Sequence, residues 1–163
     1  MDFYIFRHGE TYFSKLDIPY GDMMDSAEIL PESVPVIEKL AKYFQNIETD
    51  ANLSSPFLRC KQTVKIVEKI AGKKFFYEDE LKDWILGKES LEKMILRIKD
   101  FYGKLIKKNY KSVAICTHGY PINTLIALAT KGTVKNSDLY NYPQPGVLVV
   151  IKNKKKKYIN FNK

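Results

Sequence analysis

The stretch Asp2-Phe-Tyr-Ile-Phe-Arg7-His8-Gly9 is a short run of large apolar residues that ends in an arginine, a histidine and a glycine. A second run, Val113-Ala-Ile-Cys-Thr117-His118-Gly119, also ends in a histidine and a glycine. Such aromatic and β-branched runs predict strands over 2–7 and 112–117. The chain has only two histidines, and each would stand at the carboxyl end of a strand. The repeated context predicts that the two imidazoles meet over one site.

The remaining elements alternate between strands and helices. Short apolar stretches predict strands at 51–55 and 75–78, and a closing hairpin of 146–151 and 157–161 around the lysine tract 152–157. Apolar periodicity and capping signals predict helices over 31–44, from Ser55 and Pro56 to 71, over 91–108 and over 121–130. This order predicts βαβ units and a mostly parallel sheet, whose ligands bind outside the carboxyl ends of the strands. Two long connections, 12–30 and 131–145, flank that edge.

Size and composition predict a single globular domain over residues 1–163. Hydrophobic residues make up 45% of the chain and aromatic residues 13%, enough for a packed core. No apolar stretch approaches the roughly 20 residues that span a bilayer, so we expect no membrane attachment. Cys60 and Cys116 stand alone and form neither a disulfide framework nor a metal-ligand pattern. We therefore expect a cytoplasmic protein without a metal or other cofactor, and the sequence leaves its oligomeric state open.

The charge pattern gives weight to the arginines. The net charge of +8 comes from 24 lysines, and only Arg7, Arg59 and Arg97 are arginine. The lysines are scattered and no nucleic-acid motif accompanies them, which favours a solvated basic surface over a nucleic-acid site. Such a surface still attracts anionic substrates. Where lysine is the usual cation, an arginine marks a position that needs a planar, bidentate donor.

The residues around the first histidine suit phosphoryl transfer. A neutral imidazole can attack phosphorus, and His8 is the candidate nucleophile. Two guanidinium groups, Arg7 and Arg59, and a protonated His118 could neutralise the phosphoryl oxygens without a metal. The helix expected to begin at Ser55 adds backbone N–H donors. The remaining need is an acid that protonates the leaving oxygen.

Four segments in order carry a family resemblance. They are Arg7-His8-Gly9-Glu10-Thr11, Ser54-Ser55-Pro56-Phe57-Leu58-Arg59-Cys60-Lys61-Gln62-Thr63, Leu81-Lys82-Asp83-Trp84-Ile85-Leu86-Gly87 and Thr117-His118-Gly119. These segments resemble the motifs of the histidine phosphatase superfamily, in its phosphoglycerate-mutase-like branch. The resemblance covers nearly the whole chain. It implies an α/β fold, a three-layer α/β/α sandwich with a mostly parallel central sheet.

The resemblance also implies roles for individual residues. His8 is the residue that becomes phosphorylated. Arg7 and Arg59 hold the phosphate oxygens, and His118 is a further donor to the transferring group. Asp83 takes the position of the acid. Substrate-binding neighbours are expected at three more positions: Ser14, Gly119 and Glu10, the last as a carboxylate that orients the groups around it.

Two positions depart from the family pattern. Ser14 stands where the family usually has asparagine, which weakens one expected phosphate contact. The acid is Asp83 rather than glutamate, so its identity stays open, with Glu80 the first alternative. Further carboxylates nearby are Glu78, Asp79 and Glu89. These departures keep a second class of function in view, a phosphate-binding regulatory module that has lost turnover.

The spacing of the motifs bears on the reaction. Only 34 residues separate Asp83 from His118, and a helix and a strand take up most of them. A mutase must enclose its phosphoenzyme while the substrate reorients, so this spacing favours a phosphatase with an open site over a phosphoglycerate mutase. The chain resembles the short phosphohistidine phosphatases that act on signalling proteins. Aromatic residues in the loops could equally line a pocket for a small phosphomonoester: Tyr12, Phe13, Tyr20, Tyr140 and Tyr142.

Overall fold

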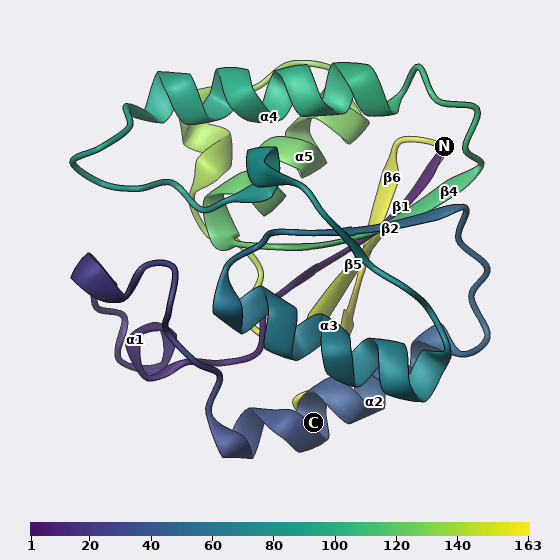
Figure 1. Ribbon diagram of the computed structural model, residues 1–163. Helices are drawn as coiled ribbons and strands as arrows, with labels where there is room; N and C mark the ends of the chain where they lie inside the picture. The colour runs from purple at the N-terminus through teal and green to yellow at the C-terminus, as the bar shows by residue number, and fades with distance from the viewer.

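The computed structural model describes residues 1–163, which form a six-stranded sheet between two layers of helices (Figure 1). The strands are β1 (Asp2–Arg7), β2 (Ala51–Ser54), β3 (Phe76–Tyr77), β4 (Ser112–Thr117), β5 (Val147–Lys152) and β6 (Lys155–Asn160). Their order across the sheet is β3-β2-β4-β1-β5-β6. The first four pair in parallel, whereas β5 is antiparallel to both β1 and β6. The predicted α/β fold with a mostly parallel sheet is confirmed.

The register between β1 and β4 brings the two histidine motifs together. The two strands are neighbours in the middle of the sheet, and Arg7 pairs with Thr117 at their carboxyl ends. His8 and His118 therefore leave the sheet side by side, and the backbone N–H of His8 donates to the carbonyl oxygen of Thr117 at 3.2 Å. Both strands are buried on both faces, which explains why their sequences are continuous apolar runs.

Helices cover both faces of the sheet. They are α1 (Tyr12–Leu16), α2 (Val34–Phe44), α3 (Leu58–Ala71), α4 (Leu91–Leu105) and α5 (Gly119–Lys131). Figure 1 shows α2 and α3 on one side of the sheet and α4 and α5 on the other. Side chains of β1 alternate between the two layers, because Phe3 and Ile5 pack with α4 and α5, whereas Tyr4 and Phe6 pack with α2 and α3. The three-layer sandwich is confirmed.

Three helices begin at other residues than predicted. Helix α2 begins at Val34 rather than at 31, because Pro31–Ser33 form a short 3-10 helix. Helix α3 begins at Leu58, not at Ser55, because the Ser55 hydroxyl is bonded to His118 and to the N–H of Phe57 within a turn. Ser55 thus looked like a helix cap in the sequence but serves a tertiary contact instead. Helix α5 begins at Gly119, earlier than the predicted start at 121, so His118 itself occupies the cap position.

The closing hairpin is tighter than predicted. The turn consists of Asn153 and Lys154, which both have left-handed backbone angles, with φ of 49° and 61°. The lysine tract was predicted to form the connection of the hairpin, but Lys155 and the lysines after it lie in strand β6 at the edge of the sheet. Charged side chains along an edge strand oppose pairing with the sheet of another molecule.

The 12–30 connection lies at the carboxyl ends of the parallel strands. It contains α1 and a short 3-10 helix, Gly21–Met23, and returns to the site through a bridge between Thr11 and Ile29. The carbonyl oxygen of Asp25 accepts the N–H of Leu58 at 3.0 Å, which fastens this connection to the start of α3. None of the five helices is long and apolar enough to cross a membrane.

Candidate active site

His8 directly follows β1, and its ring is fully buried. Its Nδ1 lies 2.7 Å from the carbonyl oxygen of Gly9, which can only accept, so this contact assigns the ring hydrogen to Nδ1. The Nε2 atom has no hydrogen-bond partner. Burial, together with the charges of Arg59 and Arg7, lowers the pKa of His8 well below its usual value. At neutral pH the ring is uncharged and keeps a free lone pair on Nε2, which is what nucleophilic attack requires.

His118 precedes α5 and meets His8 with 5.2 Å between the ring centroids. Its Nε2 lies 2.8 Å from the hydroxyl oxygen of Ser55. That oxygen accepts the N–H of Phe57 at 3.3 Å, and Nε2 is the only acceptor bonded to the hydroxyl, so we assign the hydroxyl hydrogen to this contact. The ring hydrogen of His118 is thereby assigned to Nδ1, which is buried and has no hydrogen-bond partner.

The charge state of His118 differs from the sequence-based expectation. Burial and the neighbouring Arg59 lower the pKa of His118 well below its usual value. A protonated second histidine was expected, whereas the surroundings of the ring favour its neutral form, because a further cation would be desolvated beside two guanidinium groups. The neutral ring still offers one N–H donor, at Nδ1. The arginines alone carry the positive charge of this cluster.

Arg59 is fully buried although it carries a full charge. Its guanidinium carbon lies 4.1 Å from the centroid of the Tyr20 ring. Nη1 donates to the carbonyl oxygen of Met24, and Nη2 lies 3.6 Å from the Met24 sulfur. Nη2 also donates to Oδ2 of Asp83 at 3.1 Å. Tyr20 and Met24 come from the 12–30 connection, and no local sequence signal had marked Met24 as a neighbour of the site.

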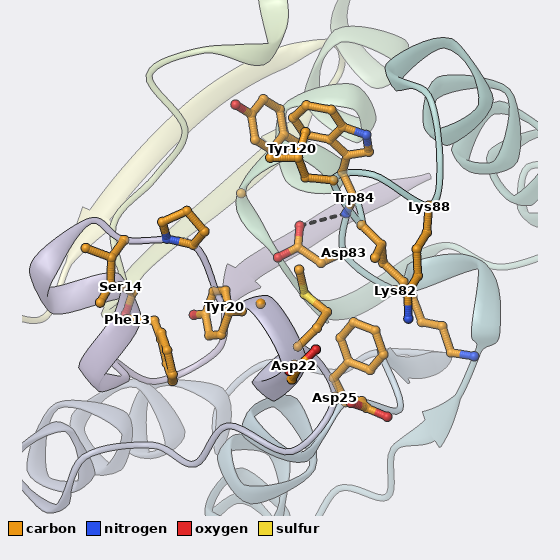
Figure 2. Close-up of a pocket in the computed structure, with 18 of the residues that line it drawn as sticks. Phe13, Ser14, Tyr20, Asp22, Asp25, Lys82, Asp83, Trp84, Lys88 and Tyr120 are labelled. Atoms are coloured by element: carbon orange, nitrogen blue, oxygen red, sulfur yellow. Dashed lines mark hydrogen bonds between the residues drawn. The ribbon is translucent and has the colours of Figure 1, made fainter.

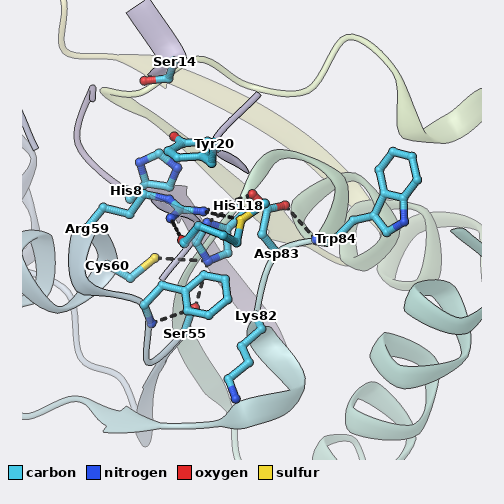
Figure 3. Close-up of polar contacts among 12 residues, drawn as sticks. His8, Ser14, Tyr20, Ser55, Arg59, Cys60, Lys82, Asp83, Trp84 and His118 are labelled. Atoms are coloured by element: carbon cyan, nitrogen blue, oxygen red, sulfur yellow. Dashed lines mark hydrogen bonds and ion pairs between the residues drawn. The ribbon is translucent and has the colours of Figure 1, made fainter. Parts of the chain in front are cut away.

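Four buried side-chain nitrogens in the structure have no hydrogen-bond partner: Nε of Arg7, Nε2 of His8, Nε of Arg59 and Nδ1 of His118. They belong to the four residues that the motifs single out, and Figure 3 shows three of these side chains gathered around Asp83. Buried polar groups are nearly always satisfied, so such a cluster marks the place of an external partner. Three of the atoms are N–H donors and one is a lone pair. An oxyanion with an electrophilic centre, such as a phosphoryl group, matches this set.

Asp83 is the carboxylate that the structure brings to the cluster. Its Oδ2 lies 3.6 Å from Nδ1 of His118 as well as against Arg59, and Oδ1 accepts the N–H of Trp84 at 2.9 Å. Burial raises the pKa of Asp83 against the opposing effect of the arginines. A raised pKa suits a carboxyl that must donate a proton. Glu80 lies elsewhere, with its carboxylate 3.6 Å from Lys104 on α4.

The third arginine holds the loop that carries Asp83. Nη1 of Arg97 donates to the carbonyl oxygen of Lys82 at 2.9 Å, and Nη2 lies 3.3 Å from the carbonyl oxygen of Asp83. Both oxygens of the Glu89 carboxylate accept from the same guanidinium, at 2.9 and 2.7 Å. The motifs did not include Arg97, and the scarcity of arginine was the only sequence signal for it.

The Tyr142 ring packs against two of the predicted site residues, Arg7 and Gly119. The Arg7 guanidinium carbon lies 4.9 Å from the centroid of the Tyr142 ring. A Cβ atom on Gly119 would lie 2.5 Å from a carbon of the same ring, so no larger residue fits there without movement. Gly119 thus allows Tyr142 to pack beside Arg7, and it also lines the cavity described below.

Ser14 and Glu10 make contacts of another kind than the four clustered residues. The Ser14 hydroxyl accepts the N–H of Thr11 at 2.8 Å, and the Thr11 hydroxyl accepts the N–H of Ser14 at 3.0 Å, a reciprocal cap of α1. Ser14 also lines the cavity. The carbonyl oxygen of Glu10 accepts the N–H of Leu30 at 2.7 Å. The Glu10 carboxylate forms no hydrogen bond or ion pair, so its expected orienting contacts are not seen.

A cavity of about 750 Å³ opens next to this cluster (Figure 2). It lies between the 12–30 connection, the loop after Asp83 and the start of α5. His8, Arg59 and His118 are themselves fully buried, so the site is more enclosed than the sequence predicted. The prediction considered only the residues between Asp83 and His118, whereas the cover comes from the 12–30 connection. No cluster of histidine, cysteine, aspartate or glutamate side chains could hold a metal ion.

The chain matches one protein family. Residues 3–88 and 83–160 match the model of the histidine phosphatase superfamily, branch 1. Among curated proteins, none matches the chain in sequence. The fold is similar to that of the α-ribazole phosphatase from Shigella flexneri, with 17% identity, a TM-score of 0.81 and coverage of 100% of this chain and 96% of that one.

Two further solved structures are similar over almost their whole length. The phosphoglycerate mutase from Bacillus anthracis str. Sterne has 17% identity and a TM-score of 0.73, over 98% of this chain and 92% of that one. The protein histidine phosphatase SixA, complexed with tungstate, has 17% identity and a TM-score of 0.68, over 98% and 94%. These likenesses show the fold, and the family match extends over all four sequence motifs. The chain belongs to the histidine phosphatase superfamily.

Proposed function

We propose that this protein is a metal-independent phosphatase that hydrolyses a phosphomonoester through a phosphohistidine on His8. The observation that carries the proposal is the set of four unpartnered nitrogens, which combines three N–H donors with one nucleophilic lone pair. A transferring phosphoryl group needs this combination, since its oxygens accept hydrogen bonds while its phosphorus accepts an electron pair. Membership of the superfamily supports the same reaction class.

The first step is transfer of the phosphoryl group to His8. The Nε2 lone pair attacks phosphorus, and the bond from phosphorus to the leaving oxygen breaks with its electron pair on that oxygen. The carboxyl of Asp83 gives its proton to the leaving oxygen, which departs as an alcohol. Arg7, Arg59 and His118 hold the phosphoryl oxygens by their N–H groups.

The second step is hydrolysis of the phosphohistidine. Asp83, now a carboxylate, accepts a proton from a water molecule whose oxygen attacks the phosphorus. The bond between phosphorus and Nε2 of His8 breaks, and its electron pair returns to the ring. Inorganic phosphate leaves, and both side chains are back in their starting protonation states. No metal ion takes part in either step.

We propose a small molecule as the substrate. The cluster lies behind a cavity of about 750 Å³, which falls in the size range of pockets for small ligands. Tyr20 is one of the aromatic loop residues predicted to line such a pocket, and it does line this cavity. A phosphohistidine on a protein surface would have to pass the same aromatic walls. The likeness to SixA keeps a phosphoprotein substrate as the second candidate.

The test is turnover and trapping after exhaustive EDTA treatment. We expect the protein to release phosphate from p-nitrophenyl phosphate, and labelled substrate to leave an acid-labile phosphate on His8. His8→Ala should abolish both signals, while Glu80→Gln should keep them. Turnover without a phosphoenzyme, or full activity in His8→Ala, would contradict the mechanism. Binding of phosphate without any turnover would favour a regulatory module instead.

A further inference from the structure

The position of Asp83 fixes where the leaving group lies. An acid that protonates the leaving oxygen must be within hydrogen-bond distance of it, on the side opposite to the attacking His8. The rest of the leaving group therefore extends beyond Asp83 into the cavity. The next residue, Trp84, lines that cavity, and its backbone N–H donates to Oδ1 of Asp83. The Trp84 side chain thus belongs to the wall of the cavity into which the leaving group extends.

The Trp84 indole is held in place without a ligand. Its Nε1 donates to the carbonyl oxygen of Glu89 at 2.8 Å, and Arg97 binds the carboxylate of the same glutamate. The Tyr120 ring packs edge-on against the indole, with 5.1 Å between the centroids, and Tyr142 lies 5.4 Å from Tyr120. The aromatic wall is therefore preorganised, so a ligand that uses it loses little freedom of the protein.

The opposite side of the cavity is also aromatic. Figure 2 shows Trp84 and Tyr120 on one side and Phe13 and Tyr20 across from them. Both walls line the same continuous cavity, and about half of its lining residues are hydrophobic. Charged residues of both signs line it: Arg7, Lys82, Lys88, Asp17, Asp22, Asp25 and Asp83. Since neither sign prevails, these charges do not favour a second charged group in the ligand, and the aromatic walls are the surfaces that favour a flat apolar one.

We propose that Trp84 and Tyr120 form a subsite for a planar, uncharged ring in the leaving group. The preferred substrates are then phosphomonoesters of alcohols that carry such a ring near the ester oxygen. This inference rests on the proposed phosphatase function, because it takes the direction of the leaving group from the role of Asp83.

The test compares 2-phenylethyl phosphate with ethyl phosphate, both esters of primary alcohols. We expect the wild-type protein to favour the ring-bearing ester in kcat/KM. Trp84→Leu should lose roughly five- to tenfold more with 2-phenylethyl phosphate than with ethyl phosphate, the effect of one lost aromatic contact. Tyr120→Leu should shift the ratio in the same direction, and it serves as the second variant if Trp84→Leu does not fold. Phe76→Leu, on the exposed edge strand β3, should leave the ratio as in the wild type.

Equal losses with both esters in Trp84→Leu and Tyr120→Leu would overturn the subsite, because the two rings would then act only on the structure. A wild-type protein that hydrolyses both esters at the same kcat/KM would also overturn it, while the phosphatase proposal would stand. A wild-type protein that hydrolyses neither ester and forms no phosphoenzyme would overturn the phosphatase proposal itself.

Discussion

The hydroxyl of Ser55 determines which nitrogen of His118 carries the hydrogen, and Ser55→Ala tests whether that matters for catalysis. With the hydroxyl assigned as the donor to Nε2, Nδ1 keeps its hydrogen and lies 3.6 Å from Oδ2 of Asp83. Without the hydroxyl, the hydrogen can move to Nε2, where the Cys60 sulfur at 3.6 Å is the remaining partner. Nδ1 would then present a lone pair to the phosphoryl oxygens, which repels them.

The size of the effect follows from the hydrogen bonds involved. A buried Nε2 of His118 without a hydrogen-bond partner costs about 1–3 kcal/mol. The hydroxyl of Ser55 therefore favours the tautomer with the hydrogen on Nδ1 over the tautomer with the hydrogen on Nε2 by this amount. A loss of this size in the transition state lowers kcat about 5- to 150-fold. Complete loss of one transition-state donor sets the upper limit, at about 10² to 10³-fold. We expect Ser55→Ala to lower kcat more than it changes KM, because the donor acts on the developing charge.

Two measurements check this prediction. Steady-state kinetics with p-nitrophenyl phosphate give kcat and KM, and ¹⁵N NMR of the imidazoles gives the tautomer directly, since the chain has only two histidines. Ser55→Thr keeps a hydroxyl and should recover much of the rate. Ser54→Ala is the matched control, because that buried serine bonds to the Ser55 carbonyl oxygen and not to a histidine. Wild-type kcat in Ser55→Ala with His118 still protonated on Nδ1 would refute the reasoning.

Three further predictions concern the acid, the clamp and the packing of the site. Burial raises the pKa of Asp83, so its carboxyl stays protonated to higher pH, and the rate falls as the pH rises through that raised pKa. Asp83→Asn should flatten this alkaline limb and cost more with alkyl phosphates than with p-nitrophenyl phosphate, whereas Glu80→Gln should do neither. Arg59→Lys should lower kcat at least tenfold, which corresponds to the loss of about one charge-assisted hydrogen bond, and should weaken inhibition by vanadate. Near wild-type kinetics in this variant would argue against Arg59 as a phosphate clamp. Gly119→Ala should lower the free energy of unfolding by about 1–3 kcal/mol, because the added Cβ would overlap the Tyr142 ring. Urea titrations measure this change, and an unchanged unfolding midpoint would show that the ring can move freely.

Local sequence patterns predicted the strands well and the helix starts less well. The strand β1 ends at Arg7, as predicted. A continuous apolar run is typical of a strand that is buried on both faces, so this strand could be read from the sequence. The start of α3 was wrong because Ser55 has the sequence of a cap but bonds to a histidine that is distant in the chain. Local propensity cannot report such a contact, since it depends on how β2 and β4 pair.

In the candidate site, too, the sequence predicted residues within local motifs but not those whose role depends on tertiary contacts. The motifs predicted the four residues whose nitrogens lack partners, and all four lie in one cluster. They did not predict Met24, because it binds the guanidinium through its backbone carbonyl oxygen, which every residue type has. Arg97 also escaped the motifs, since its partners are mainly backbone carbonyls of a loop whose shape the sequence does not give. The choice between Asp83 and Glu80 as the proposed acid also needed the structure, in which the Asp83 carboxylate contacts Arg59 and the Glu80 carboxylate contacts Lys104.

The contacts between Met24 and Arg59 have a consequence for affinity. In the structure the Met24 carbonyl oxygen and sulfur accept from the guanidinium. An incoming phosphate oxygen must exchange with these groups rather than meet a bare charge, so only the difference between the two sets of bonds contributes to binding. Inorganic phosphate gains nothing from the aromatic walls, so it relies on the unpartnered N–H groups of Arg7, Arg59 and His118 and on that small difference at Arg59. If the protein is the phosphatase proposed above, we expect the 12–30 connection to compete with the product phosphate for Arg59 and so to favour its release.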